Sequence, residues 1–278
     1  MHDQPTPPPS STASSKPLPR ASHRPRGIYL LPNLFTTAAL FCGFFAIVSA
    51  MRGFFADGAI AIFIAMICDS LDGRIARMTD TQTAFGAEYD SLSDMVSFGV
   101  APALVVYEWS LQGMGKLGWL VAFVYTATTA LRLARFNTQL CVEDKRYFQG
   151  LPSPSAAAIV AGLVWVGVFY DITGVRLEIP ALLLTLLAGL LMVSNIRYNS
   201  FKNLNVRGKV PFVTLLVVVL GLVAIAIHPP LILFAGFTVY ALSGPVLTLI
   251  HLRRRRTSRG HAPVDPNQPP NQPPNQPL

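Results

Sequence analysis

Four aspartates lie within two apolar stretches that are each long enough to form a membrane-spanning helix. Asp69 and Asp72 belong to the first stretch, and Asp90 and Asp94 belong to the next. A carboxylate in hydrocarbon is costly, so acids at membrane depth usually mark a functional site. At helical spacing, positions i, i+3 and i+4 share one face, so each helix presents both of its acids on one side. The two helices can therefore direct four carboxylates toward one point.

Four like charges cannot converge without a counter-charge. Hard divalent cations with oxygen ligands, Mg²⁺ or Mn²⁺, suit a site made only of carboxylates. Two such ions about 4 Å apart can clamp a phosphoryl group, and a free carboxylate can take a proton from an attacking hydroxyl. Arg77, one turn after Gly73, is placed to pair with phosphate. The pattern predicts phosphoryl or phosphatidyl transfer at a membrane surface, with two divalent cations as cofactors.

The composition predicts an all-α, polytopic membrane bundle. Hydrophobic residues make up 51% of the chain and charged residues only 13%, whereas soluble domains carry roughly 25% charged residues. Several apolar runs approach the ~20 residues that cross a bilayer. About eight transmembrane helices are expected, at 29–50, 54–76, 86–108, 119–137, 153–171, 177–194, 210–227 and 231–251.

The positive charges predict the orientation of the bundle. With eight spans, all of the 22 Lys and Arg residues except Arg52, Lys116 and Arg176 fall on the same side as the N-terminus. Positive charge concentrates on the cytoplasmic side of membrane proteins. Both termini and the aspartates are therefore expected to face the cytoplasm, across the inner membrane if the source is bacterial. The net charge of +8 then faces anionic lipid, and no nucleic-acid partner is expected.

Composition also divides the chain into three parts. Residues 1–26 are rich in Pro and Ser and are expected to be disordered. Residues 27–252 are expected to form the transmembrane domain. Residues 253–278 begin with a basic run and continue as a Pro/Asn/Gln-rich repeat, which predicts a second disordered tail.

The stretch from Asp69 to Asp94 resembles the signature of the CDP-alcohol phosphotransferase family. That signature is D-x-x-D-G-x-x-A-R, eight residues, then G-x-x-x-D-x-x-x-D, and every fixed position matches. The resemblance implies that all four aspartates bind metal and that Asp94 is also the general base. It implies a CDP-diacylglycerol site made from Asn33, Thr36, Gly73, Arg77 and Thr83. For Asn33 and Thr36, an equally good interpretation is that they cap the start of the first helix.

Four further stretches resemble the membrane-integral phosphatidylserine synthases within this family. They are residues 31–44, 131–137, 148–157 and 193–202. The resemblance implies CDP-diacylglycerol and L-serine as substrates, phosphatidylserine and CMP as products, and a homodimer. A site for serine needs a basic group and hydrogen-bonding partners, and the expected residues are Arg135, Asn137, Arg197 and Ser200. The alternative for each arginine is ordinary cytoplasmic positive charge or contact with lipid headgroups.

Two other functions stay open on the sequence. The same chemistry could serve another acceptor, such as glycerol 3-phosphate, inositol phosphate or choline. Alternatively, the aspartates could bind ions in an ion-coupled transporter. A transporter would explain the buried acids but not the D-G-x-x-A-R element, and it favours internal repeats, which the sequence does not show.

Overall fold

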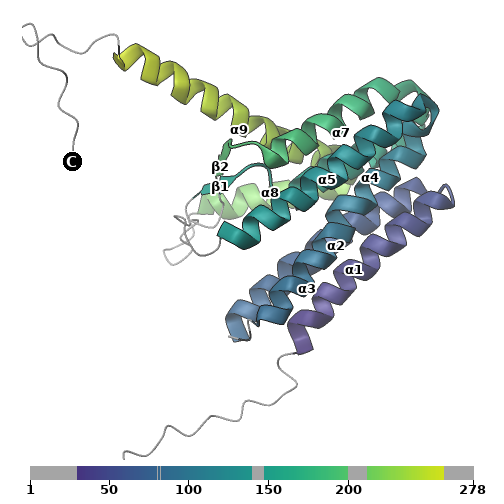
Figure 1. Ribbon diagram of the computed structural model, residues 1–278, viewed down its shortest axis with the longest axis horizontal. Helices are drawn as coiled ribbons and strands as arrows, with labels where there is room; N and C mark the ends of the chain where they lie inside the picture. Colours follow the sequence, from purple (N-terminus) through teal and green to yellow (C-terminus); the bar gives the residue numbers. More distant parts are fainter. Residues whose placement is uncertain (1–29, 80, 82, 140–146, 200–211, 260–278) are drawn as a thin grey trace, which may run out of the picture.

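The computed structural model describes residues 30–79, 81, 83–139, 147–199 and 212–259. Each of the eight predicted stretches coincides with helical structure (Figure 1). The helices are α1 (Leu30–Met51), α2 (Phe55–Thr79), α3 (Ala84–Asp94), α4 (Ala101–Val106), α5 (Lys116–Gln139), α6 (Ser153–Phe169), α7 (Glu178–Val193), α8 (Phe212–Ile227) and α9 (Pro229–Arg259). The predicted all-α class is therefore confirmed.

The third predicted helix is one continuous helical stretch with two π-helical segments in it. The segment η2 (Met95–Val100) follows α3 directly, and η3 (Tyr107–Leu111) follows α4. Short 3₁₀ turns, η4 (Gln112–Met114) and η5 (Gly174–Leu177), precede α5 and α7. π-Helical segments are rare and concentrate at functional sites, because the wider turn redirects the side chains beside it. Here the first one begins immediately after Asp94.

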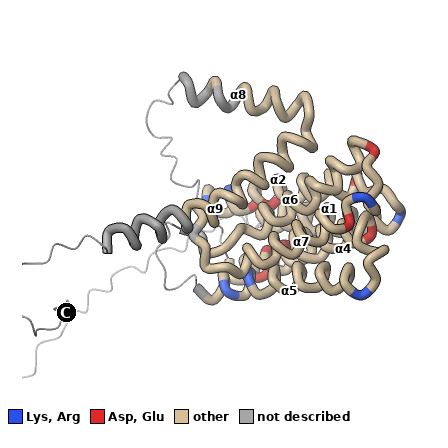
Figure 2. The backbone as a smooth tube through the Cα atoms, turned by 90° about the horizontal axis from the view of Figure 1, so that it is seen from above, with Lys and Arg blue, Asp and Glu red and all other residues tan. Residues whose placement is uncertain are grey.

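Four helical stretches among the described residues are long and apolar enough to cross a membrane. They are Leu31–Met51, Lys116–Thr138, Gly174–Val193 and Pro229–Thr248, and α6 is apolar but shorter. Figure 2 shows that the charged positions gather toward the two ends of the bundle. The chain is therefore a helical membrane protein, while the count of eight crossings stays a prediction.

Small residues allow α1 and α2 to pack closely. These two helices make the most extensive contact between elements of the described structure. Ala39, Ala46 and Ala59 are almost completely buried in it, and a side chain added at Gly58 would meet the carbonyl oxygen of Ala46 at 3.0 Å. Close backbone approach through small residues is the usual way in which membrane helices associate. It fixes α2, which carries Asp69 and Asp72, against α1.

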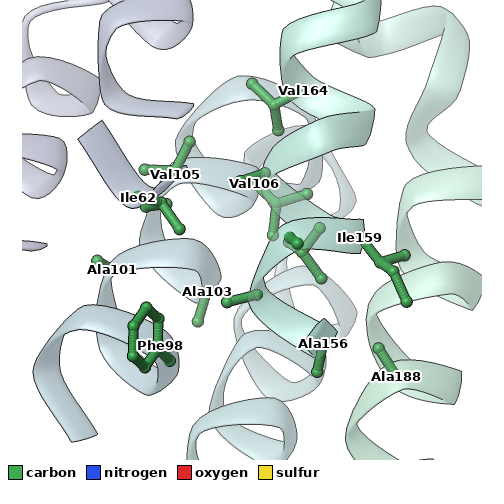
Figure 3. Packing of buried hydrophobic residues seen from close by; sticks show 14 of the residues in the cluster. Ile62, Phe98, Ala101, Ala103, Val105, Val106, Ala156, Ile159, Val164 and Ala188 are labelled. Carbon is green, nitrogen blue, oxygen red and sulfur yellow. The ribbon is translucent and has the colours of Figure 1, made fainter. Parts of the chain in front are cut away.

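Helix α6 lies at the centre of the bundle. It is buried along almost its whole length and packs against α2, α4, α7 and α9. Figure 3 shows Ile159 and Val164 of this helix among Ile62 and Val106 of its neighbours. A helix that is apolar on every side is expected to be surrounded. Helix α2, which carries Asp69 and Asp72, therefore packs against a fully surrounded central helix.

A two-stranded antiparallel sheet joins two distant parts of the chain, and the sequence analysis did not predict it. Strand β1 (Tyr147–Gln149) pairs with β2 (Arg197–Asn199), with Gln149 opposite Arg197. Gly150, directly after β1, has a φ of 79° and lies against the carbonyl of Met192. Only glycine fits this left-handed, crowded position. The sheet brings the stretch that begins at residue 148 next to residues 197–199 of the stretch that begins at residue 193.

Helices α8 and α9 are less embedded. Helix α8 packs mainly against α9, and its apolar side chains are largely exposed, including Leu220 and Leu222. Helix α9 continues to Arg259, beyond the predicted start of the basic tail at residue 253. The predicted disorder of residues 1–26 lies outside the described residues.

Replacement of Gly43 by alanine should destabilise the bundle. A Cβ at this position of α1 would lie 2.7 Å from the Cα of Ser97 in η2, so the two segments would have to separate. We expect a loss of about 1–3 kcal/mol in the free energy of unfolding, seen as a lower thermal midpoint of the protein in detergent. Gly236→Ala in α9 is the matched control, because nothing lies within 4 Å of its added Cβ. Equal midpoints for both variants would show that α1 and η2 do not need this close approach.

Candidate active site

Three of the four predicted carboxylates come together between α2 and α3. One oxygen from each of Asp69, Asp72 and Asp90 lies within 4.8 Å of the others. Asp72 is buried, and the other two are half-buried. The expectation that two neighbouring helices converge their acids on one point is confirmed for these three residues.

Asp94 follows Asp90 by one helical turn and is the last residue of α3. Its carboxylate interacts electrostatically with those of Asp69 and Asp90, and like charges repel one another unless a counter-charge is present. We call the four residues the acidic cluster. Within it, Asp94 lies to one side of the compact group of three.

Helix α1 supplies the wall behind Asp72. The Thr36 hydroxyl is buried, 2.8 Å from Oδ2 of Asp72 and 3.1 Å from the carbonyl of Pro32. The Asn33 side chain faces Gly86, at 3.5 Å from where a Cβ there would lie. Both Asn33 and Thr36 are inside α1, which begins at Leu30. The alternative interpretation, that they cap this helix, is therefore wrong.

Serines at helical spacing fasten α3 and η2 to α1. Ser93 donates a hydrogen bond to the Thr36 carbonyl at 3.0 Å, and Ser97 donates one to the Ala39 carbonyl at the same distance. Both serines are almost completely buried. A third contact joins the hydroxyls of Thr37 and Tyr89 at 2.9 Å. These bonds fix the position of α3, which carries Asp90 and Asp94, along α1, whose Thr36 hydrogen-bonds Asp72.

Two signature residues have visible local roles. Thr83 is the N-cap of α3, where its hydroxyl accepts a hydrogen bond from the Gly86 backbone at 3.0 Å. The predicted contact of Thr83 with the substrate stays a prediction beside this capping role. The Arg77 guanidinium lies over Gly73, at 3.4 Å from where a Cβ would be. Arg77 also interacts electrostatically with Asp72.

A second arginine, Arg132, interacts with another acid of the cluster. It projects from α5, and its Nη1 donates a hydrogen bond to the Ser153 hydroxyl of α6 at 2.8 Å. Its guanidinium interacts electrostatically with Asp94. The expected serine contacts did not include Arg132. The signal that could have found it is its place between Leu131 and Leu133, in the last part of the predicted span 119–137, where an arginine usually has a specific role.

Comparison with known proteins identifies the family. The family model for CDP-alcohol phosphatidyltransferase matches residues 29–191. The chain belongs to the CDP-alcohol phosphatidyltransferase family. This match decides between the enzyme and the transporter hypotheses in favour of the enzyme.

Several relatives within this family carry names that include the acceptor. The CDP-diacylglycerol–serine O-phosphatidyltransferase of Helicobacter pylori is 37% identical over 216 residues, which are 77% of this chain and 90% of the relative. The protein of the same name from Methanocaldococcus jannaschii is 39% identical over 142 residues, 51% of this chain and 63% of the relative. An archaetidylserine synthase of Methanothermobacter thermautotrophicus is 34% identical over 170 residues, 60% of this chain and 69% of the relative.

The four predicted serine contacts of this phosphatidyltransferase lie in different parts of the chain, and the structure describes only some of them. Asn137 donates a hydrogen bond to the hydroxyl of Ser91, the residue after Asp90 in α3, at 3.0 Å. Arg135 is half-buried on the same helix. Arg197 lies in β2, paired with Gln149, and its side chain is outside the described part. Ser200 lies outside the described residues altogether.

The acidic cluster fits the divalent cations expected of this enzyme. Its donors are carboxylate oxygens, and these hard ligands suit Mg²⁺ and Mn²⁺. Three of them are already close enough to share an ion after a small movement. Residues of both helices would therefore hold the metal.

Removal of one carboxylate should weaken metal binding strongly. We expect Asp90→Asn to lower the affinity of the purified protein for Mn²⁺ by roughly tenfold to a hundredfold, since the charge and a ligand atom are both lost. Titration followed by the electron paramagnetic resonance of free Mn²⁺ would measure this. Asp57→Asn, at the exposed start of α2, is the matched control and should bind as the native protein does. Unchanged affinity for Asp90→Asn would remove this residue from the metal site.

Proposed function

We propose that the protein transfers the phosphatidyl group of CDP-diacylglycerol to the hydroxyl of L-serine, giving phosphatidylserine and CMP. The observation that carries the acceptor is the 37% identity, over 90% of its length, to the Helicobacter pylori protein that is named for this reaction. The geometry agrees with it. The stretches 131–137, 148–157 and 193–202, which resemble phosphatidylserine synthases, are joined to one another by the Arg132–Ser153 bond and by the β1–β2 sheet.

The donor would lie at the side of the cluster formed by α1 and the second half of α2. Gly73 and Gly86 leave room there for a bulky nucleotide, because neither carries a side chain. Arg77 is placed to pair with a phosphate oxygen. Asn33, Thr36 and Thr83 border the same space. These five contacts, Asn33, Thr36, Gly73, Arg77 and Thr83, form the proposed CDP-diacylglycerol site.

Asp69, Asp72, Asp90 and Asp94 would hold two divalent cations, Mg²⁺ or Mn²⁺. When bound, the ions supply charge that neutralises the pyrophosphate and its developing negative charge. The chain itself positions the substrates and moves the proton. Asp94, set apart from the other three acids, accepts the proton of the serine hydroxyl. The serine oxygen then bonds to the phosphorus that carries diacylglycerol, and the bond from that phosphorus to the CMP oxygen breaks.

The cellular setting is part of the same proposal. Eight spans with both termini and the cluster on the cytoplasmic side agree with the placing of all but three basic residues. Two of those exceptions agree with this: Arg52 lies in the turn before α2, at the other end of that helix from Arg77, and Lys116 begins α5, at the other end from Arg132. A homodimer rests on the family resemblance, and Arg135, Asn137, Arg197 and Ser200 remain proposed serine contacts.

The acceptor can be tested directly. Membranes that contain the protein would receive CDP-diacylglycerol, Mn²⁺ and labelled L-serine, glycerol 3-phosphate or inositol phosphate. We expect CMP release and a labelled lipid with serine alone. Asp94→Asn should lower the rate at least a thousandfold, because the base is lost, while the nucleotide lipid still binds. Release of CMP with another acceptor, and none with serine, would overturn the proposed substrate.

The variant Gly73→Ala tests whether the nucleotide occupies the space beside Gly73, without a loss of stability that would confuse the result. The added methyl group would have no atom closer than the Arg77 guanidinium, at 3.4 Å, and alanine favours a helix over glycine by about 1 kcal/mol. The variant should therefore fold as stably as the native protein. We expect its KM for CDP-diacylglycerol to rise roughly tenfold, because the methyl group occupies space that the nucleotide needs. A native KM with unchanged stability would place the nucleotide elsewhere.

A further inference from the structure

Arg132 has a buried donor without a partner. Its Nη1 is held by Ser153, but its Nε is buried and makes no hydrogen bond. In the described part of the chain it forms no ion pair with Asp94, although the two charges interact. A buried donor without a hydrogen-bond partner is unfavourable, and an anionic group would pair well with it on a guanidinium. The Nε of Arg132 is therefore suited to bind an anion.

The two arginines beside the acidic cluster interact with different acids of it. Arg77 interacts with Asp72, next to α1 and the glycines, whereas Arg132 interacts with Asp94, next to α5 and α6. The nucleotide needs the glycine end, where side chains are missing. The end that remains for the acceptor is the one formed by Arg132, Ser153 and Asp94.

The chemistry of the acceptor fits this end. In L-serine the hydroxyl oxygen and the carboxylate are separated by only two carbon atoms, so the groups that bind them must be neighbours. A hydroxyl that gives its proton to Asp94 therefore brings the carboxylate close to Arg132. Ser153 is bound to Nη1, so the edge of the guanidinium formed by Nε and Nη2 remains available. This edge can donate two parallel hydrogen bonds to the two oxygens of a carboxylate.

We infer that Arg132 binds the carboxylate of the acceptor amino acid, held in position by its hydrogen bond to Ser153. This inference rests on the proposed function, because it assumes that the acceptor is serine. It names a specificity residue: an acceptor that lacks a carboxylate leaves the Nε of Arg132 unpaired and is rejected. Sites built around a buried polar partner reject analogues without it strongly.

Comparison of L-serine with serinol, in which a hydroxymethyl group replaces the carboxylate, tests the assignment. The native protein should use serine with a kcat/KM at least a hundredfold higher. In Arg132→Gln, the KM for serine should rise roughly tenfold to a hundredfold. The kcat/KM for serinol and the KM for CDP-diacylglycerol should stay close to native values, so the preference for serine largely disappears. Arg132→Lys keeps the charge without the fork and should fall between the two.

Arg176→Gln, an exposed arginine in η5, is the control and should behave as the native protein. An equal loss with serine and serinol would mean that Arg132 only supports the fold. A higher KM for CDP-diacylglycerol alone would assign it to the pyrophosphate. Either result overturns the inference while the proposed function stands. If Arg132→Gln does not fold, the test uses Arg132→Lys together with the ratio of kcat/KM for serine and serinol in the native protein. A native enzyme that uses both acceptors equally well refutes the inference. Failure of the proposed function looks different, because the native protein would then release no CMP with serine.

Discussion

Repulsion between carboxylates in a poorly polar setting governs this structure. Asp69, Asp72 and Asp90 approach within 4.8 Å of one another, and Asp94 follows Asp90 by one helical turn. In water such charges would separate, and in hydrocarbon each would be costly even alone. Two helices can hold them together only if the rest of the fold prevents the helices from moving apart.

The packing around the cluster provides this resistance. Helix α1 lies against α2 through small residues and is tied to α3 and η2 by buried serine hydroxyls, Ser93 and Ser97. Behind them the apolar α6 fills the centre of the bundle. The π-helical segment after Asp94 leaves the carbonyl of Phe98 to a hydrogen bond from the buried Tyr125 hydroxyl, at 3.1 Å. This packing keeps the carboxylates close together although they repel one another, and bound cations would neutralise the repulsion.

Much of this architecture could be predicted from the sequence, because the strongest signals are periodic. The apolar runs gave the helices, and the spacing of Asp69, Asp72 and Asp90 gave their convergence. The β1–β2 sheet was missed, since three-residue strands have no periodicity and pair residues that are distant in sequence. Arg132 was passed over in favour of Arg135 for a similar reason. Only the packing of α5 against α6 reveals which arginine turns inward, toward Ser153.

The central claim is that the four acids gather cations to hold a pyrophosphate. Diffraction from crystals grown with Mn²⁺ and CDP-diacylglycerol, recorded at the manganese absorption edge, tests it most directly. We predict two anomalous peaks about 4 Å apart, bounded by Asp69, Asp72, Asp90 and Asp94, with the pyrophosphate beside them. Manganese bound elsewhere, or a pyrophosphate bound away from these carboxylates, would contradict the account.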